Sequence, residues 1–354
     1  MIYNRGNRAD FDALVALGNP GWGWDDVLPI YRQMENHALG AGPTRGAGGL
    51  LDISTATDLP QLCDDTIEAG VAAGLKRTDD VNDSDEERIG PAARTITRGT
   101  RVSSARSFLR PVLGRPNLTV RTGATVTQVL VEGDRAVGVR VTDGGTMTDQ
   151  RAALEVVLSL GSLATPRLLQ LSGIGDAAHL RGIGIDARVD SPDVGQRMRE
   201  HRTVTLQYRL RGSVQITSAD PTAPLDIDPQ FLTSASDRQR TAALFRRIRI
   251  RDLFGLEPVA SKIRRETVPG PGVQSDDEIV DAALDLGYCG YHAVGTAAMG
   301  PDPGDVVDSR LRVRGLRGLR IVDCSVLPTM VAGNLNAPIM AMAWRAADLM
   351  REDA

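Results

Sequence analysis

The chain has 354 residues, 42% of them hydrophobic and 24% charged, which excludes a disordered or fibrous protein. The formal net charge is -4, with 41 basic and 45 acidic residues scattered along the chain, so no basic stripe is available for nucleic acid. No apolar run is long enough for a membrane span, and three widely spaced cysteines favour a reducing, cytoplasmic location over a disulfide framework or a metal site.

The first third of the chain is predicted to contain short helices joined by loops. Three helices are expected, over residues 10–17, 25–36 and 58–74, with a glycine-rich loop over 40–49. Arg5, ahead of the first helix, is expected to face either a cofactor or, by default, solvent. His37 is expected in a surface context and is assigned no role.

The middle of the chain is predicted to change from helix to strand. Alternating apolar and polar residues predict an antiparallel meander over three segments, 118–122, 126–131 and 136–142. The nearly continuous apolar run 154–160 predicts a strand buried on both faces. Gly161 follows it directly, and Thr165 with Pro166 predicts the start of a helix. Such a strand, turn and helix face the ligand crevice in open α/β sheets.

The last part of the chain is predicted to mix both kinds of element. Strands are expected over 204–210, 214–218 and 319–322, and helices over 237–253, 275–286 and 337–350. Residues 275–278 form a capping box that opens the second of these helices. The whole order of elements indicates an α/β protein that also carries antiparallel strands.

His292 is the candidate general base. It lies in a nearly uncharged loop rich in glycine and threonine, between a helix and the last α/β segment, where a positioned base can be held. A neutral imidazole accepts a proton close to neutral pH. A lone histidine more often has a structural role, so the residues alone leave both interpretations open.

One motif carries most of the functional information. It spans residues 161–175 and matches a family signature at Gly161, Ser162, Thr165, Pro166, Leu168, Leu169, Ser172, Gly173, Ile174 and Gly175. Further matching blocks occur in the family's order, over residues 3–6, 17–29, 99–103, 115–118, 194–201, 291–300, 322–329 and 333–338. On these residues the chain resembles the glucose-methanol-choline (GMC) family of flavin oxidoreductases.

The resemblance implies FAD-dependent oxidation of an alcohol. It implies that His292 takes the proton of the substrate hydroxyl while the carbon-bound hydrogen leaves as hydride to flavin N5. Asn334 is implied to hold the substrate oxygen, since an amide can donate to a developing alkoxide without titrating. Oxygen or a quinone-like carrier would accept the electrons. His201 belongs to a family motif that is structural or flavin-adjacent, and hydroxynitrile-lyase-like activity is an alternative on the same scaffold.

The resemblance also implies a set of flavin contacts. Asp323 follows a short apolar strand and would meet a ribityl or sugar hydroxyl, with a capping or turn role as its alternative. Asn336 competes with Asn334 for the substrate role or caps the last helix, whose N-terminus would face the flavin pyrimidine edge. Cys324 is either a contact or small buried packing. The full set is Val126, Asp323, Cys324, Asn336, Ala337 and Pro338.

The chain departs from the family pattern in two places. The flavin-binding GxGxxG is missing, and residues 40–45 cannot replace it because they lack the third glycine. Near Arg211 the family carries a longer segment. We therefore expect an incomplete Rossmann-like FAD-binding domain over 1–36, 117–200 and 302–354, and an antiparallel-sheet substrate domain over 37–116 and 201–301. Met1 is expected to be an internal methionine or a miscalled start, and an inactive, flavin-free homologue is the alternative to an enzyme.

Overall fold

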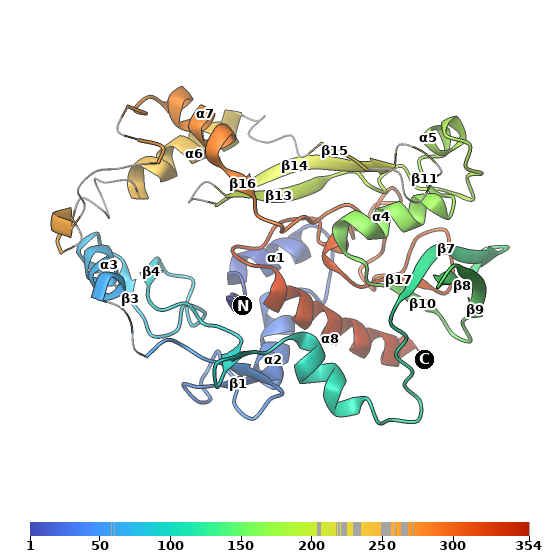
Figure 1. Cartoon of the computed structure of the whole chain (residues 1–354), viewed down its shortest axis with the longest axis horizontal. Helices are drawn as coiled ribbons and strands as arrows, with labels where there is room; N and C mark the ends of the chain where they lie inside the picture. The colour runs from blue at the N-terminus through green and yellow to red at the C-terminus, as the bar shows by residue number, and fades with distance from the viewer. Residues whose placement is uncertain are drawn as a thin grey trace.

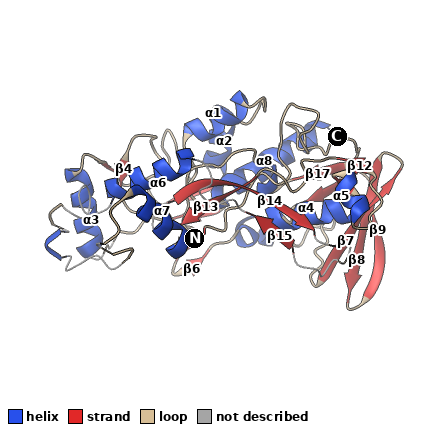
Figure 2. Cartoon of the chain, turned by 90° about the horizontal axis from the view of Figure 1, so that it is seen from above, coloured by secondary structure: helices blue, strands red, loops and turns tan. Residues whose placement is uncertain are grey.

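The computed structural model describes residues 1–57, 59, 61–203, 207–216, 218, 220, 225–228, 235–248, 256–258, 260–262, 268–270 and 272–353. The fold is elongated, as two perpendicular views show (Figures 1 and 2). The long helix α8, Asn336–Asp353, lies in its middle. Helix α3, Gln61–Ala72, lies at one end and strand β8, Arg135–Asp143, at the other.

The N-terminal helices pack on α8. Helix α1 covers Arg8–Ala16 and α2 covers Trp24–Met34, close to the predicted ranges, and α2 contacts α8. Phe11, Trp24 and Tyr31 form an aromatic cluster between α1 and α2, with ring centroids 5.6 to 6.2 Å apart. These rings bury large apolar surfaces, which are a main source of stability for short helices.

A buried polar network lies beside the first β pair, in which β1, Glu35–His37, runs parallel to β2, Leu51–Ile53. Arg5 donates to both carboxylate oxygens of Glu35, from Nε at 2.8 Å and Nη2 at 2.7 Å, and both side chains are fully buried. His37 is also buried, with Nε2 3.7 Å from Asp80 Oδ2. The expected surface positions of Arg5 and His37 are therefore wrong, because each faces a carboxylate that lies far along the chain.

Short elements follow this pair. The two-stranded pairs are β3, Lys76–Arg77, with β4, Arg88–Ile89, and β5, Ile96–Thr97, with β6, Thr100–Arg101. Two irregular turns of helix come next, η1, Ala105–Leu109, and η2, Arg110–Val112.

The meander has three strands, but one of the predicted strands is wrong. It consists of β7, Ala124–Glu132, then β8, and then β9, Thr146–Arg151, in the order β7-β8-β9. Residues 118–122 form no strand. The pattern missed β9 because all six of its residues are exposed and show no apolar alternation. Gly144 and Gly145, both with positive φ, make the turn that places β9 against β8.

A parallel strand pair leads into the helix that carries the main motif. Strand β10, Val156–Leu158, pairs with β17, Leu319–Ile321. Helix α4, Gly161–Leu171, starts five residues before Pro166, the predicted first helical residue, so Thr165 is not its N-cap. The Thr165 hydroxyl lies inside the first turns of α4, where it donates to Asp323 Oδ2 at 2.6 Å and accepts from the Leu160 amide at 3.3 Å. Small elements follow, namely β11, Ile174–Gly175, α5, Ala177–Gly182, and β12, Val189–Asp190.

An antiparallel sheet forms one side of the molecule. Its order is β15-β14-β13-β16, with β13 over Met198–Thr203, β14 over Gln207–Ile216, β15 over Leu225–Asp228 and β16 over Tyr288–Cys289. The two strands predicted over 204–210 and 214–218 are a single strand within 207–216, while residues 204–206 and 217 lie outside the described residues. Beside this sheet lie α6, Ala235–Ile248, and α7, Asp276–Leu286, which opens with the predicted capping box. The short turn η3, Ala260–Lys262, lies away from the sheet, near α3 (Figure 1).

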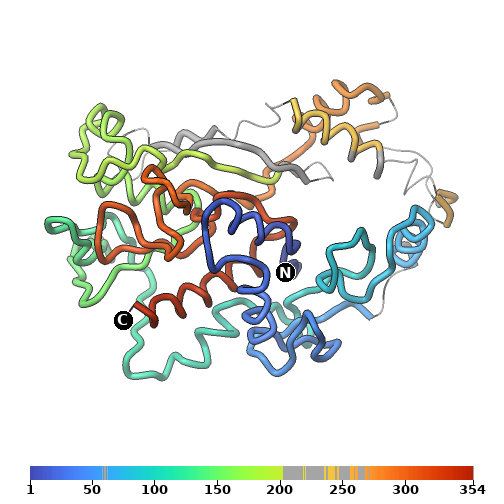
Figure 3. Tube along the Cα trace, turned by 180° about the vertical axis from the view of Figure 1, so that it is seen from behind, coloured from blue at the N-terminus to red at the C-terminus, as the bar shows by residue number. Residues whose placement is uncertain are grey.

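One hydrophobic cluster joins these parts. It includes residues of α1, α2, α4 and α8 together with β10 and β17. Seen from behind, α8 and the segment ahead of it, which includes η4, Cys324–Val326, run through the centre of the trace (Figure 3). The loop before α8 contacts the segment that follows β16, through Asn334 and His292. The expected division into two discontinuous domains stays a prediction.

Candidate active site

His292 lies between an amide and a second imidazole. Its Nε2 is 3.2 Å from Asn334 Nδ2, and its Nδ1 is 2.9 Å from His201 Nδ1. The two imidazole rings meet edge to face, with centroids 5.1 Å apart and planes at 88°. Every nitrogen of the His292 ring therefore has a polar neighbour, and the ring orientation is fixed from both ends.

Glu200 holds the backbone of both histidines. Its carboxylate accepts from the His292 amide at 2.8 and 3.0 Å and from the His201 amide at 2.7 Å. The Cys289 thiol donates to the same carboxylate at 3.2 Å. Glu200 and His201 are each 3% exposed, so these contacts are sheltered from water. A carboxylate that accepts several N–H donors holds their backbones in fixed positions.

The loop that carries His292 is fastened to α4. The Ser162 hydroxyl donates to Ala293 O at 2.6 Å, and the Thr296 hydroxyl donates to Ser162 O at 2.7 Å. Pro166 has no N–H, so it cannot bond the carbonyl four residues earlier, which is that of Ser162. Thr296 therefore bonds a carbonyl that the helix itself leaves free. The residue 161–175 motif and the loop that carries His292 meet through these contacts.

Asp323 occupies the start of α4. Its Oδ2 accepts from the Thr165 hydroxyl and from the Gly161 amide at 3.0 Å, and its Oδ1 accepts from the Ser325 amide at 2.8 Å. The carboxylate thus caps both α4 and η4, which is the alternative that the sequence left open. A direct flavin contact of this residue stays a prediction.

The other predicted contacts fall into two groups. Cys324 lies at the site, where its thiol is 3.2 Å from Ser162 Oγ, and burial raises the pKa of this thiol. Asn336 is exposed and is the first helical residue of α8. Ala337 and Pro338 are buried in the core side of α8, and Val126 pairs with Val141 in the meander. The structure thus brings His292, Asn334 and Cys324 together around α4, and the flavin roles of the rest stay predictions.

A cavity of about 520 Å³ opens beside His292. Its walls are mostly apolar, and it is lined by Leu160, Gly161, Ser162, Leu163, Met198, Glu200, Cys289, Tyr291, Ala293 and Cys324. Tyr291 and Ala293 flank His292 in sequence. Tyr291 has φ 59°, a left-handed conformation that is strained for an aromatic residue and that is found most often at functional sites.

The cavity fits the ring portion of a flavin. A Cβ added at Gly161 would meet nothing within 4 Å, so a flat ring can approach the backbone at the start of α4. The apolar walls suit an aromatic ring system. None of the lining residues is basic, and Asp323 already neutralises the α4 N-terminus, so the described lining holds the ring end and not the diphosphate.

Burial sets the protonation state of the candidate base. It lowers the pKa of His292 below the ordinary value of 6.5, and the charge of Glu200 opposes that shift only in part. At neutral pH the His292 ring is therefore unprotonated on one nitrogen and able to accept a proton.

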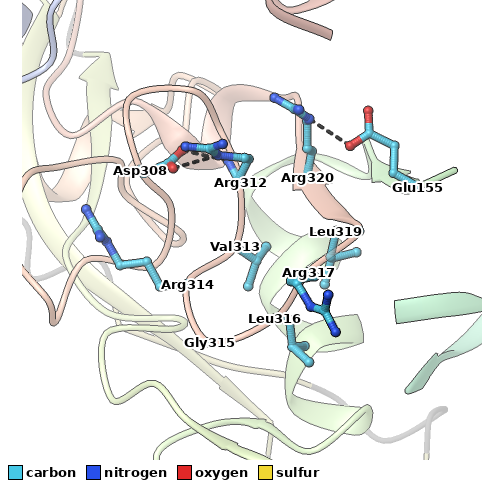
Figure 4. A pocket seen from close by; sticks show the side chains of 11 residues that line it. Glu155, Asp308, Arg312, Val313, Arg314, Gly315, Leu316, Arg317, Leu319 and Arg320 are labelled. Atoms are coloured by element: carbon cyan, nitrogen blue, oxygen red, sulfur yellow. Dashed lines mark hydrogen bonds and ion pairs between the residues drawn. The ribbon is translucent and has the colours of Figure 1, made fainter. Parts of the chain in front are cut away.

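A second cavity, of about 460 Å³, lies at an arginine-rich turn (Figure 4). Arg312 pairs with Asp308 and Arg320 pairs with Glu155, as the dashed lines show. Arg317 pairs with Asp134, and Arg314 donates to Gly300 O at 2.6 Å. Three of the four guanidinium groups thus have carboxylate partners, so this cavity has a balanced lining with no strong attraction for an anion.

The sequence did not predict that His201 and Glu200 contact His292. Their adjacency within a family motif was the available signal, but nothing in the order of residues shows that His201 meets His292 across 91 positions. Within the described ranges, no group of three or more His, Cys, Asp or Glu side chains could hold a metal ion. In the same ranges no helix has the length and apolar character that crossing a bilayer requires.

Comparisons with known proteins agree on one family. Two sequence profiles described as GMC oxidoreductase match the chain, one over residues 1–203 and the other over residues 209–343. An alcohol dehydrogenase (acceptor) of Pseudomonas putida is 32% identical, over 99% of this chain and 79% of its own length. An oxygen-dependent choline dehydrogenase of Sinorhizobium fredii is 31% identical, over 98% of this chain and 79% of its own. The crystal structure of pyridoxine 4-oxidase from Mesorbium loti covers 99% of this chain and 82% of its own, with a TM-score of 0.91 and 28% identity.

These matches confirm the resemblance seen in the sequence, the predicted fold class and FAD as the cofactor. The chain belongs to the GMC oxidoreductase family, a family of FAD-dependent alcohol oxidoreductases.

Proposed function

We propose that this chain oxidises an alcohol to a carbonyl compound with His292 as the base and Asn334 as the residue that holds the substrate oxygen. The observation that carries the proposal is the 3.2 Å approach of Asn334 Nδ2 to His292 Nε2 beside the apolar cavity. A hydroxyl group has one donor and can accept, so it complements this pair. It would donate to Nε2 and accept from the amide, replacing their direct contact.

The base is prepared for this task by its surroundings. The lowered pKa keeps His292 in its accepting form at neutral pH, and Glu200 fixes the backbone of the loop. As the hydroxyl proton moves to Nε2, the growing negative charge on the substrate oxygen strengthens its hydrogen bond from Asn334. Bound FAD supplies the acceptor for the hydride that leaves the substrate carbon. The residues that would hold its ring are those at the start of α4 and at Cys324.

The pair of Asn334 and His292 supports a primary or secondary alcohol as the substrate, because a hydroxyl group complements one donor and one acceptor. The names of the relatives widen the set to be tested, since they include choline and pyridoxine oxidoreductases. Their names also support oxygen or a different acceptor for the electrons.

The test begins with titration of the purified chain with FAD, followed by flavin fluorescence anisotropy. The complex is then mixed without oxygen with choline, pyridoxine and a series of aliphatic and aryl alcohols. Loss of the visible flavin absorbance is expected with at least one alcohol. His292→Gln should slow it about a hundredfold or more, as for loss of a general base, with FAD affinity unchanged.

The matched control is His179→Gln in α5, which should reduce flavin at the parent rate. An unchanged rate in His292→Gln would remove His292 from the role of base. A complex that keeps its flavin colour with every alcohol, yet cleaves a cyanohydrin, would favour the lyase alternative. A chain that binds no FAD would favour the inactive alternative.

A further inference from the structure

The contact between the two histidines restricts where their protons lie. The His201 and His292 Nδ1 atoms are 2.9 Å apart, a hydrogen-bond distance, so exactly one of them carries the proton when both rings are neutral. Asn334 Nδ2 is a donor and faces His292 Nε2 at 3.2 Å, so Nε2 carries a lone pair. The His292 proton then lies on Nδ1, and His201 Nδ1 is the acceptor.

His201 is built into the fold in a way that suits an acceptor. It lies in β13 and is 3% exposed, and its carbonyl accepts from Gly290 N at 2.7 Å. Its own amide donates to Glu200, whose carboxylate also holds the His292 amide. These contacts hold the backbones of His201 and His292 side by side, which keeps the two imidazoles within hydrogen-bond distance.

We infer that His201 is a positioning residue that holds His292 in the Nδ1–H tautomer, so that the Nε2 lone pair faces the substrate hydroxyl. The inference rests on the proposed function for its catalytic meaning, since only a base at Nε2 needs this tautomer. When Nε2 accepts a proton, the His292 ring becomes positively charged, and its Nδ1–H bond to His201 becomes charge-assisted. His201 therefore stabilises the ring most in the state that forms during the reaction.

The groups that face His292 have separate roles in this arrangement. Glu200 contacts the backbone amide of His292 and adds a general negative charge. Cys289 donates to Glu200. Asn334 is neutral at every pH. Among these, His201 is the group that hydrogen-bonds the Nδ1 atom itself.

The closing experiment measures the tautomer without turnover. The chain has four histidines, so nitrogen NMR of histidine-labelled protein, assigned with His201, His179 and His37 variants, resolves the His292 ring. The expected spectrum shows a protonated Nδ1 and a lone pair on Nε2. His201→Phe removes the acceptor, so the His292 proton should move toward Nε2. His292 should also titrate at a lower pH, because its charged form loses a stronger hydrogen bond than its neutral form does.

A conservative variant separates positioning from folding. The side-chain oxygen of His201→Asn can lie where Nδ1 lies and accept the same proton, so this variant should restore the tautomer and most of the flavin-reduction rate that His201→Phe loses. His179→Asn is the matched control and should change neither. A parent spectrum with Nε2–H on His292 would overturn the inference, as would equal tautomer shifts in His201→Phe and His201→Asn.

The two proposals fail separately. If the Nδ1–H tautomer is found and depends on residue 201, but no alcohol reduces the flavin, the structural inference is supported and the proposed function is refuted. If alcohols reduce the flavin at the same rate and with the same pH dependence in His201→Phe, the function is supported and the role of His201 is refuted.

Discussion

Replacing Arg5 with methionine should be among the most destabilising single changes in the described chain. Arg5 and Glu35 are both fully buried, and the guanidinium makes two short bonds to the carboxylate. The carboxylate raises the pKa of Arg5 against the opposing effect of burial. Arg5→Met leaves the Glu35 charge with two remaining donors, the Tyr3 hydroxyl at 2.6 Å and the Gly46 amide at 3.0 Å.

The size of the effect follows from the cost of an uncompensated buried charge. Removing one partner of a buried ion pair costs about 3 to 5 kcal/mol, a large share of a typical unfolding free energy of about 5 to 15 kcal/mol. Arg5 also loses its bond to Thr44 O at 2.5 Å and its position 5.4 Å from the Tyr31 ring centroid. These losses place the expected cost at the upper end of that range.

Urea unfolding followed by far-ultraviolet circular dichroism measures the change in the free energy of unfolding. The control is Arg8→Met, because Arg8 pairs with Asp25 at 2.7 Å at the surface, where water screens the pair and its contribution to stability is small. Adding Glu35→Gln to Arg5→Met removes the unpaired carboxylate. The double variant should therefore lose less free energy of unfolding than the two single variants lose when their losses are added. The reasoning is refuted if Arg5→Met costs no more than Arg8→Met.

Three further outcomes are expected. Burial lowers the pKa of both His37 and His292 below 6.5, so the unfolded chain binds more protons and the free energy of unfolding should fall as pH drops below that value. Urea unfolding measured at a series of pH values down to pH 5, about 1.5 units below the ordinary histidine pKa, checks this. A urea midpoint that rises toward pH 5 contradicts it. Gly46→Ala places a Cβ 1.8 Å from Arg32 O and should cost about 1 to 3 kcal/mol or prevent folding, whereas an unchanged thermal midpoint would contradict the clash. Ser275→Ala removes the cap of α7 and should cost about 1 kcal/mol, measured by urea unfolding, with Ser218→Ala as the loop control.

Elements with strong local signals were predictable from the sequence. Helix α7 begins at its capping box, and α8 follows the amphipathic pattern over 337–350. Strand β9 was not predictable, because its exposed residues carry no alternation and only its hairpin with β8 makes it a strand. For such segments, pairing with a neighbouring strand determines whether they form a strand.

At the candidate site, too, some side-chain positions were predictable from the sequence and others were not. His292 and Asn334 were found because the resemblance marks both, and the structure places them 3.2 Å apart. Arg5 and His37 were misplaced at the surface because charge or polarity alone predicts exposure. Their partners, Glu35 and Asp80, lie 30 and 43 positions away, and no local pattern predicts which carboxylate will reach a buried arginine or histidine.

The motif around α4 identifies the family, but its sequence does not show which contacts its residues make. Pro166 frees the carbonyl of Ser162, and that carbonyl accepts from Thr296, 134 positions away. Thr165 bonds Asp323 across 158 positions. From the local sequence, Pro166 and Thr165 are expected only to start or cap a helix. In the structure, this part of α4 forms hydrogen bonds to segments far away in the sequence. The motif's side chains therefore bond segments far away in the sequence, and these bonds set the position of the His292 loop against α4.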